Sequence, residues 1–173
     1  VLGGIAYKVF TTHTKLPRHE KIFTPLFKKS IFTHRDRDFL NAIVKFPIQV
    51  NELMKKDVIS KSPDTSVRDA AKIMARKKIG SVVIVDAGNA VGILTDRNVL
   101  RRVVAQGKSP DTTPCKDVMT SPVVTVDYTD TVVDAIDEMV RNKVKKIVVL
   151  KDNKIVGIIS AFDIVNHSTH VDV

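Results

Sequence analysis

Hydrophobic residues recur with helical spacing at two places along the chain. Apolar side chains occupy positions i, i+3, i+4 and i+7 from Val67 to Met74, and again from Val132 to Met139. This spacing gathers the apolar side chains on one face of an α-helix. An extended stretch rich in Asp, Thr and Ser, the residue types that cap helix N-termini, precedes each run. The pattern predicts two amphipathic helices, each burying one face.

Short β-branched runs follow each of these helices. The first helix is followed by VVIV, a polar turn DAGN and the run VGIL, and the second by IVVL, the turn KDNK and the run VGII. Two apolar strands joined by a short polar turn are typical of a β-hairpin. The last strand continues directly into another helix, which we predict over residues 96–105 in the first case and 161–167 in the second.

The two patterns are copies of one unit. When residues 53–100 are superimposed on residues 118–165 without a gap, 12 of the 48 positions are identical, which indicates an internal duplication. A unit this short buries too little surface to be stable alone, so the copies must pack on each other. We therefore predict an α/β (α+β) fold: two β-α-β-β-α repeats packed sheet to sheet, with pseudo-twofold symmetry and a cleft on the axis between them.

Composition divides the chain near Pro47. Residues 1–47 hold nine Lys and Arg against three acidic residues, and seven of the nine aromatic residues, whereas the rest is nearly balanced in charge. We predict a basic, aromatic-rich N-terminal extension over residues 1–47, a first repeat over residues 48–107 and a second over residues 108–173.

Several functional classes find no support in the sequence. No apolar run reaches the ~20 residues that a membrane-spanning helix requires. Cys115 is the only cysteine, so an internal disulfide is excluded and nothing indicates an oxidising compartment. The five histidines show no metal-ligand spacing, and neither a phosphate-binding glycine loop nor a nucleophile elbow occurs. We expect a soluble cytoplasmic protein that is not an enzyme, and a chain beginning with Val1 fits a trimmed or partial product.

The endings VGILTDRN and VGIISAFD, the order of elements and the tandem pairing resemble the cystathionine β-synthase (CBS) domain pair, or Bateman module, over residues 48–167. The resemblance implies a regulatory ligand-sensing module rather than a catalyst. It implies adenosine-containing ligands, AMP, ADP, ATP or S-adenosylmethionine, bound in clefts between the repeats. It also implies a flat homodimer formed through exposed helices.

The resemblance assigns roles to particular residues. The ribose-binding aspartate of the family corresponds to Asp163, and the neighbouring hydroxyl, used near phosphate or ribose, to Ser160 and Thr95. The first repeat departs from the family at Asn98, whose amide lacks the charge that lets a carboxylate accept strongly from both ribose hydroxyls. We therefore expect a competent site at Asp163 and a weak, altered or empty one at Asn98.

Other candidates surround these residues. The first N–H groups of the helix after Ser160 lack backbone acceptors and attract phosphate, and Gly157 would let a ligand approach the backbone. An adenine requires a flat apolar slot, and its phosphates require cations. The resemblance implies that the remaining candidate ligand-binding residues are Ile59, Ile79, Gly80, Ser81, Arg97, Val124, Val144, Lys145, Lys146 and Ile158.

Three alternatives compete with ligand binding. The pairs Ser160–Asp163 and Thr95–Asn98 also read as capping boxes, in which each polar group serves only its helix. Residues 1–47 interleave Phe with Lys and Arg, which suits base stacking on nucleic acid or docking on the module or a partner protein. The chain could then be a basic nucleic-acid-binding protein that uses the repeats as a dimerisation scaffold. A purely structural assembly piece with blocked clefts is the third hypothesis.

Overall fold

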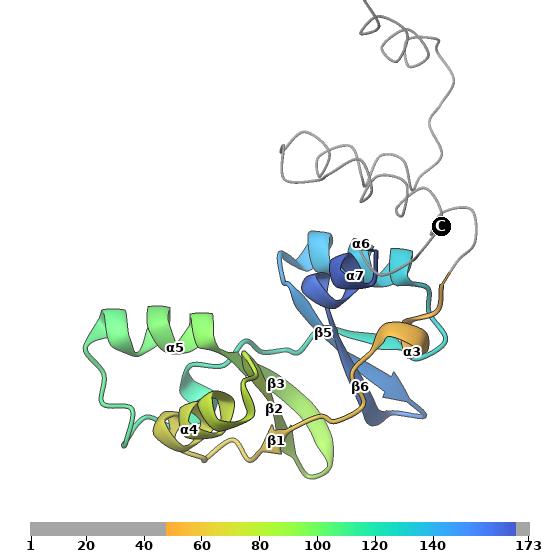
Figure 1. Cartoon of the computed structure of the whole chain (residues 1–173). Helices are drawn as coiled ribbons and strands as arrows, with labels where there is room; N and C mark the ends of the chain where they lie inside the picture. Colours follow the sequence, from red (N-terminus) through yellow and green to blue (C-terminus); the bar gives the residue numbers. More distant parts are fainter. Residues whose placement is uncertain (1–47, 169–173) are drawn as a thin grey trace, which may run out of the picture.

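The computed structural model describes residues 48–168, which form two similar α+β units (Figure 1). The first unit contains β1 (Ser60–Lys61), α4 (Val67–Lys77), β2 (Ser81–Asp86), β3 (Asn89–Thr95), α5 (Asp96–Arg102) and a 3-10 turn (Val104–Gln106). The second contains β4 (Thr125–Asp127), α6 (Val132–Asn142), β5 (Lys146–Lys151), β6 (Lys154–Ser160) and α7 (Ala161–Ser168). Helix α3 (Val50–Leu53) precedes the first unit in the chain but packs on the second, and a 3-10 turn (Cys115–Asp117) precedes the second but packs on the first.

Each unit contains one three-stranded sheet with the same topology. The first strand runs parallel to the second, and the second pairs antiparallel with the third, in the orders β1-β2-β3 and β4-β5-β6. The hairpin turns place two consecutive residues at positive φ, Ala87 and Gly88 in one and Asp152 and Asn153 in the other, which matches the twist of the flanking strands. The predicted mixed fold of two β-α-β-β-α repeats is confirmed.

Capping side chains mark the N-terminal ends of the two long helices, α4 and α6. The Ser66 hydroxyl accepts a hydrogen bond from the Asp69 N–H at 3.1 Å, and Thr131 forms a capping box with Asp134 at the start of α6. The predicted helix over residues 96–105 is wrong at its end, because α5 stops at Arg102 and a separate 3-10 turn follows.

The core consists of three layers of side chains: one between α4 and the first sheet, one between the two sheets, and one between the second sheet and α6. Alternate residues of β2 and β3 pack against α4, and the same positions of β5 and β6 pack against α6. The intervening residues Val83, Ile93 and Val148 are also buried but belong to neither of these clusters. Since strand residues alternate between faces and β3 contacts β6, these side chains fill the space between the two sheets. The sheets therefore pack face to face, as predicted.

Two segments cross from one unit to the other, and we call them the crossing arms: residues 48–55 and residues 113–120. The Val50 N–H donates to the Asp130 carbonyl at 2.8 Å, and Lys55 exchanges two backbone hydrogen bonds with Ile158 at 2.9 and 3.0 Å. The first arm, which contains α3, therefore lies on the second repeat. Helix α3 and its position were missed by the sequence analysis.

The second crossing arm makes the equivalent contacts on the first repeat. The Cys115 N–H donates to the Thr65 carbonyl at 2.9 Å, and Thr120 exchanges two backbone hydrogen bonds with Ile93 at 2.9 and 3.0 Å. These pairs sit 65 positions from their counterparts in the first arm. Each repeat is thus completed by the segment that precedes the other repeat.

A glycine in each sheet makes room for a methionine of an arm. A Cβ atom on Gly157 would lie 2.4 Å from the sulfur of Met54, and one on Gly92 would lie 2.3 Å from the sulfur of Met119. The space beside Gly157, which the sequence analysis assigned to a ligand, is therefore filled by Met54.

The predictions for residues 1–47, including docking or nucleic-acid binding, lie outside the described residues and stay predictions. Among the helices of residues 48–168, none has both the length and the apolar character needed to cross a membrane.

Candidate functional site

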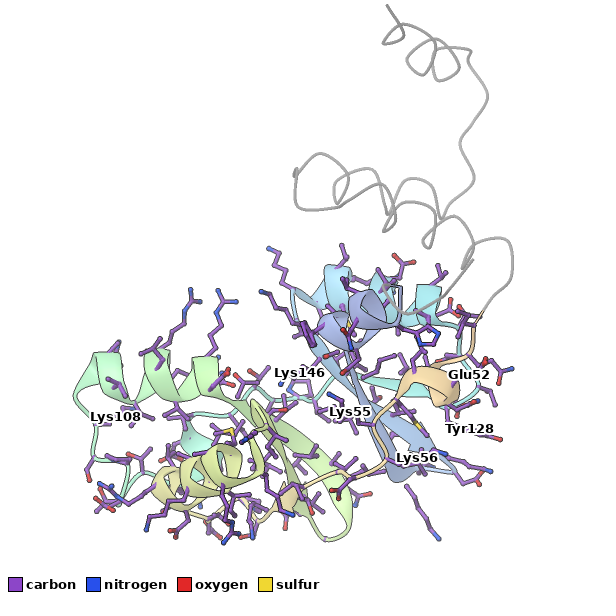
Figure 2. All side chains as sticks on the ribbon, in the orientation of Figure 1. Glu52, Lys55, Lys56, Lys108, Tyr128 and Lys146 are labelled. Carbon is purple, nitrogen blue, oxygen red and sulfur yellow. The ribbon has the colours of Figure 1, made fainter. Side chains whose placement is uncertain are left out.

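A cleft of about 280 Å³ opens between the two repeats. Figure 2 places Lys55 and Lys146 on its sides, between the two units. The cleft is lined by Lys55, Asp57, Val58 and Ile59, by Lys78, Ile79, Gly80, Ser81 and Val83, and by Lys146, Ile158, Ser160, Phe162 and Asp163. Three lysines and two aspartates thus surround a lining that is otherwise mostly apolar.

The structure brings some of the sequence-predicted residues together here. Those lining the cleft are Ile59, Ile79, Gly80, Ser81, Lys146, Ile158, Ser160 and Asp163. Those outside it are Thr95, Arg97, Asn98, Val124, Val144 and Lys145, and each is the repeat counterpart, 65 positions away, of a residue lining this cleft. The predicted set therefore falls into two groups related by the pseudo-twofold axis.

Asp163 sits in the first turn of α7 and serves as its cap. Its Oδ2 accepts hydrogen bonds from the Ser160 N–H, at 3.0 Å, and from the Ser160 hydroxyl, while its own N–H donates to that hydroxyl at 3.2 Å. The capping box read from the sequence therefore forms. It uses only one of the two carboxylate oxygens.

The second oxygen of Asp163 faces Lys55. The Lys55 Nζ lies 2.7 Å from Oδ1, and the Asp163 side chain is only 12% exposed while that of Lys55 is 67% exposed. Burial alone would raise the pKa of Asp163, but the hydrogen bonds from Lys55 and Ser160 and the Lys55 charge outweigh it, so the pKa lies below its ordinary value. Asp163 is therefore held as a nearly buried, ionised carboxylate at the cleft.

Lys146 lies on the symmetry axis. Its Nζ is 3.3 Å from the Ser81 hydroxyl. Ser81 is the residue of the first repeat that corresponds to Lys146 in the second, 65 positions away, so the two side chains meet across the axis. Burial lowers the pKa of Lys146, an effect that the charges of Asp96 and Asp163 oppose and that of Lys55 reinforces. The neighbouring Lys145 is exposed instead. The cleft thus contains a half-buried ammonium group whose pKa lies below the ordinary value for lysine.

The Asn98 side carries a neutral version of the same contacts. Asn98 is 9% exposed, and its Oδ1 accepts from the Thr95 N–H at 2.9 Å and the Thr95 hydroxyl at 2.7 Å. Its Nδ2 donates to the Thr120 hydroxyl at 3.2 Å, and Thr120 is the repeat counterpart of Lys55. An amide–hydroxyl hydrogen bond therefore replaces the ammonium–carboxylate pair.

Other lining residues were missed by the sequence analysis: Lys55, Asp57, Val58, Lys78, Val83 and Phe162. Lys55 could not be found by comparing the repeats, because its counterpart is a threonine. Cys115 is fully buried, and burial raises the pKa of its thiol. Within residues 48–168, no group of three or more His, Cys, Asp or Glu side chains is placed to hold a metal ion.

The sequence model of the CBS domain matches the chain twice, over residues 50–105 and 115–170. The chain belongs to the CBS domain family. Both matched stretches coincide with the repeats of the structure, so this is a tandem CBS pair, a regulatory ligand-binding module.

Proteins with similar sequences occur in different organisms. An uncharacterized protein of Methanopyrus kandleri is 37% identical over 119 residues, which cover 68% of this chain and 61% of that protein, less than two thirds of its length. The mitochondrial CBS domain-containing protein CBSX3 of Arabidopsis thaliana is 28% identical over 169 residues, covering 88% of this chain and 82% of that protein.

Solved structures share the fold of this CBS pair. An uncharacterized conserved protein of Pyrococcus horikoshii matches with a TM-score of 0.67 and 27% identity, covering 73% of this chain and 96% of the other. The CBS domain pair of protein MJ0100, in complex with 5′-methylthioadenosine and S-adenosyl-L-methionine, matches with a TM-score of 0.66 and 26% identity, covering 73% and 99%. A hexameric CBS-CP12 protein from bloom-forming cyanobacteria matches with a TM-score of 0.65 and 25% identity, covering 69% of this chain and 67% of that one.

Proposed function

We propose that this CBS pair is a regulatory sensor that binds one adenosine-containing ligand in the cleft beside Asp163. The observation that carries the proposal is the state of this carboxylate: nearly buried, ionised, and with only one oxygen committed to the helix cap. The ligands of the MJ0100 pair, which both contain adenosine, support the ligand class.

Each part of such a ligand finds suitable chemistry. Asp163 Oδ1 can accept hydrogen bonds from a ribose diol once Lys55 is displaced from it. The apolar side chains of Val58, Ile59 and Ile79 suit a flat base. A cleft of 280 Å³ lies just below the range for small-molecule sites, about 300–1,000 Å³, so it suits a small ligand such as a mononucleotide with one end in solvent.

The lysines favour anionic ligands. Lys55, Lys78 and Lys146 all line the cleft, and a phosphate chain can meet one or more of them. Among residues 48–168, no acceptor is found for the N–H of Phe162 in the first turn of α7, so this donor can serve a phosphate as well. The sulfonium of S-adenosylmethionine carries a positive charge, which these ammonium groups repel. AMP, ADP or ATP is therefore the preferred ligand.

The Asn98 side is not part of the proposed site. Its amide is committed on both atoms, to Thr95 and to Thr120, and it has no charge with which to attract a diol. We expect one ligand per chain. We also expect the module to form a homodimer through its helices and to reside in the cytoplasm. The alternative, nucleic-acid binding, depends on residues 1–47 and gains no support from the described residues.

Calorimetric titration tests the proposal, with AMP, ADP, ATP and S-adenosylmethionine added separately to the full chain. The decisive variant is Asp163→Asn, which gives α7 the same cap that Asn98 provides for α5 and replaces the charged oxygen facing Lys55 by an uncharged NH2 group. The matched control is Asp134→Asn, which makes the same change in the capping box of α6, outside the cleft. Far-UV circular dichroism verifies that both variants fold.

We expect at least one nucleotide to bind to the wild type near one per chain. A lost hydrogen bond to a charged group costs about 1.5–3 kcal/mol, so Asp163→Asn should weaken binding by roughly 10-fold or more. Asp134→Asn should leave the affinity unchanged. Binding that survives in Asp163→Asn would place the ligand elsewhere. No binding of any adenosine ligand would reduce Ser160 and Asp163 to a helix cap.

A further inference from the structure

The amine of Lys146 has a fixed place inside the cleft. Lys146 begins β5 and reaches across to the first repeat, where its Nζ lies 3.3 Å from the Ser81 hydroxyl (Figure 2). A Cβ atom on Gly80 would lie only 3.0 Å from the same Nζ, so the amine rests against backbone that carries no side chain. The segment at Gly80 and Ser81 therefore positions this amine between the two repeats.

Within residues 48–168, Lys146 forms no ion pair with a carboxylate. Lys55 differs, because its Nζ contacts Asp163 at 2.7 Å. Burial lowers the pKa of Lys146, and the charges of Asp96 and Asp163 offset only part of this effect. More of this lysine is therefore unprotonated at neutral pH than of an ordinary one. The ionisable groups around it are Lys55, Asp57, Lys78, Asp96 and Asp163.

We propose that Lys146 is an acylation site, at which a small acyl phosphate transfers its acyl group to the amine. A lysine taken out of water reacts as a nucleophile because its amine can be uncharged. Lys55 and Lys78 line the same cleft and attract the phosphate of the donor. A cleft of about 280 Å³ has room for a donor as small as acetyl phosphate.

The reaction is an acyl transfer without any oxidation or reduction. The lone pair of the Lys146 Nζ attacks the carbonyl carbon and forms a C–N bond, and the bond from that carbon to the phosphate oxygen breaks. The phosphate leaves with the electron pair of that bond and takes up the proton that the nitrogen loses. The products are an amide on Lys146 and inorganic phosphate. The Ser81 hydroxyl can accept the remaining N–H of the amide, so the contact made by the amine is kept.

Acylation would change the ligand site, a consequence that rests on the proposed function. The amide carries no charge, so the cleft would lose one of its three ammonium groups. The acyl group would also take up part of the space open to a ligand. Both changes oppose the binding of a phosphate chain beside Asp163. Lys146 would then act as a covalent control of nucleotide affinity.

Mass spectrometry of the full-length chain tests the modification without any nucleotide. The chain is treated with acetyl phosphate at pH 7 and at pH 10.5, and then cleaved after acidic residues. Lys145 and Lys146 lie between Glu138 and Asp152, so one peptide reports on both. At pH 7, Lys146 should be acetylated faster than the exposed Lys145, by roughly threefold or more.

This preference should disappear at pH 10.5, where exposed lysine amines are unprotonated to a large extent as well. Equal rates for Lys145 and Lys146 at pH 7 would overturn the proposal. A preference for Lys146 that is the same at both pH values would also overturn it, because accessibility and not the buried amine would then set the rate.

A charge variant checks the electrostatic part of the argument. Asp96→Asn removes a carboxylate that raises the pKa of Lys146, so acetylation of Lys146 at pH 7 should become faster. The matched control is Asp86→Asn, at an exposed position outside the cleft, which should leave the rate unchanged. Far-UV circular dichroism verifies that both variants fold. A rate in Asp96→Asn that is unchanged or slower would contradict the proposal.

The consequence for ligand binding has its own measurement. Lys146→Gln places an uncharged amide in the cleft and should weaken ATP binding in calorimetry by roughly three- to tenfold, whereas Lys145→Gln should bind ATP like the wild type. Equal ATP affinities of Lys146→Gln and the wild type would refute the control of affinity. A wild-type chain that binds no nucleotide would refute the proposed function, while the acetylation rates would still decide whether Lys146 is an acylation site.

Discussion

Replacement of Lys55 by methionine tests whether this side chain competes with the ligand for Asp163. Lys55→Met removes the ammonium and keeps an unbranched chain of similar length. If a ribose diol binds Asp163 Oδ1, Lys55 must first leave the position it holds 2.7 Å away. Removing it should therefore tighten the binding of adenosine, which has no phosphate to benefit from the cation.

The magnitude follows from the exposure of the two partners. Exposed ion pairs contribute about 0.2–1 kcal/mol, and hydrogen bonds to buried charged groups about 1.5–3 kcal/mol. With Asp163 12% exposed and Lys55 67% exposed, the pair lies between these cases, at about 1 kcal/mol. Adenosine should thus bind roughly fivefold more tightly to Lys55→Met. ATP, which loses a cation for its phosphates, should bind roughly three- to tenfold more weakly.

Parallel calorimetric titrations of adenosine and ATP measure both effects on the same protein samples. The matched control is Thr120→Val, which removes the equivalent contact on the Asn98 side and should change neither affinity. The opposite directions for the two ligands are the signature of competition. If adenosine binding weakens together with ATP binding, Lys55 supports the ribose site rather than occupying it, and the reasoning fails.

Three further predictions concern stability. Gly157→Ala should destabilise the fold by about 1–2 kcal/mol in urea unfolding, because the new methyl group collides with the sulfur of Met54; adding Met54→Ala should remove this penalty, and strictly additive effects would contradict the packing. Asp163→Asn should lose stability relative to the wild type at neutral pH, because the depressed pKa of Asp163 stabilises the folded state above the ordinary value of 3.8. The difference should shrink as the pH falls below 3.8, and a pH-independent difference would contradict it. Lys146→Met should raise the melting temperature at pH 7, because burial of the charged amine opposes folding there; since the pKa of Lys146 is lowered, the gain should shrink as the pH approaches 10.5, and a gain that persists would refute the burial argument.

Much of the fold could be predicted because its signals are local and occur twice. The helix from Val67 to Lys77 follows from the spacing of its apolar residues, and its copy at α6 repeats the spacing with different side chains. The hairpins follow from β-branched runs around polar turns. The end of α5 could not be predicted in this way, because Val103 is apolar and in helical register, so nothing in the pattern marks it as the C-cap at which α5 ends.

The candidate site was predictable only as far as the repeat and the resemblance reach. Ser160, Asp163 and Gly80 could be assigned because each has a counterpart and a family position. Lys55 reaches Asp163 only because a crossing arm carries it from one repeat to the other, a contact between residues 108 positions apart. Periodicity describes neighbours along a helix or strand, so it gives no information about such a pairing. The separation of the candidates into two groups required the actual placement of the repeats.

The crossing arms also determine what happens when the chain is divided. A cut between Gly107 and Thr113 leaves each half with the arm that belongs to the other half: residues 48–55 stay with the first repeat but complete the second, and residues 113–120 do the reverse. We therefore expect the halves to behave as complementary fragments that associate by exchanging arms. A single-repeat ancestor would have needed the same exchange between two molecules. In that sense the present chain is an arm-exchanged dimer whose subunits have been joined by duplication into one polypeptide.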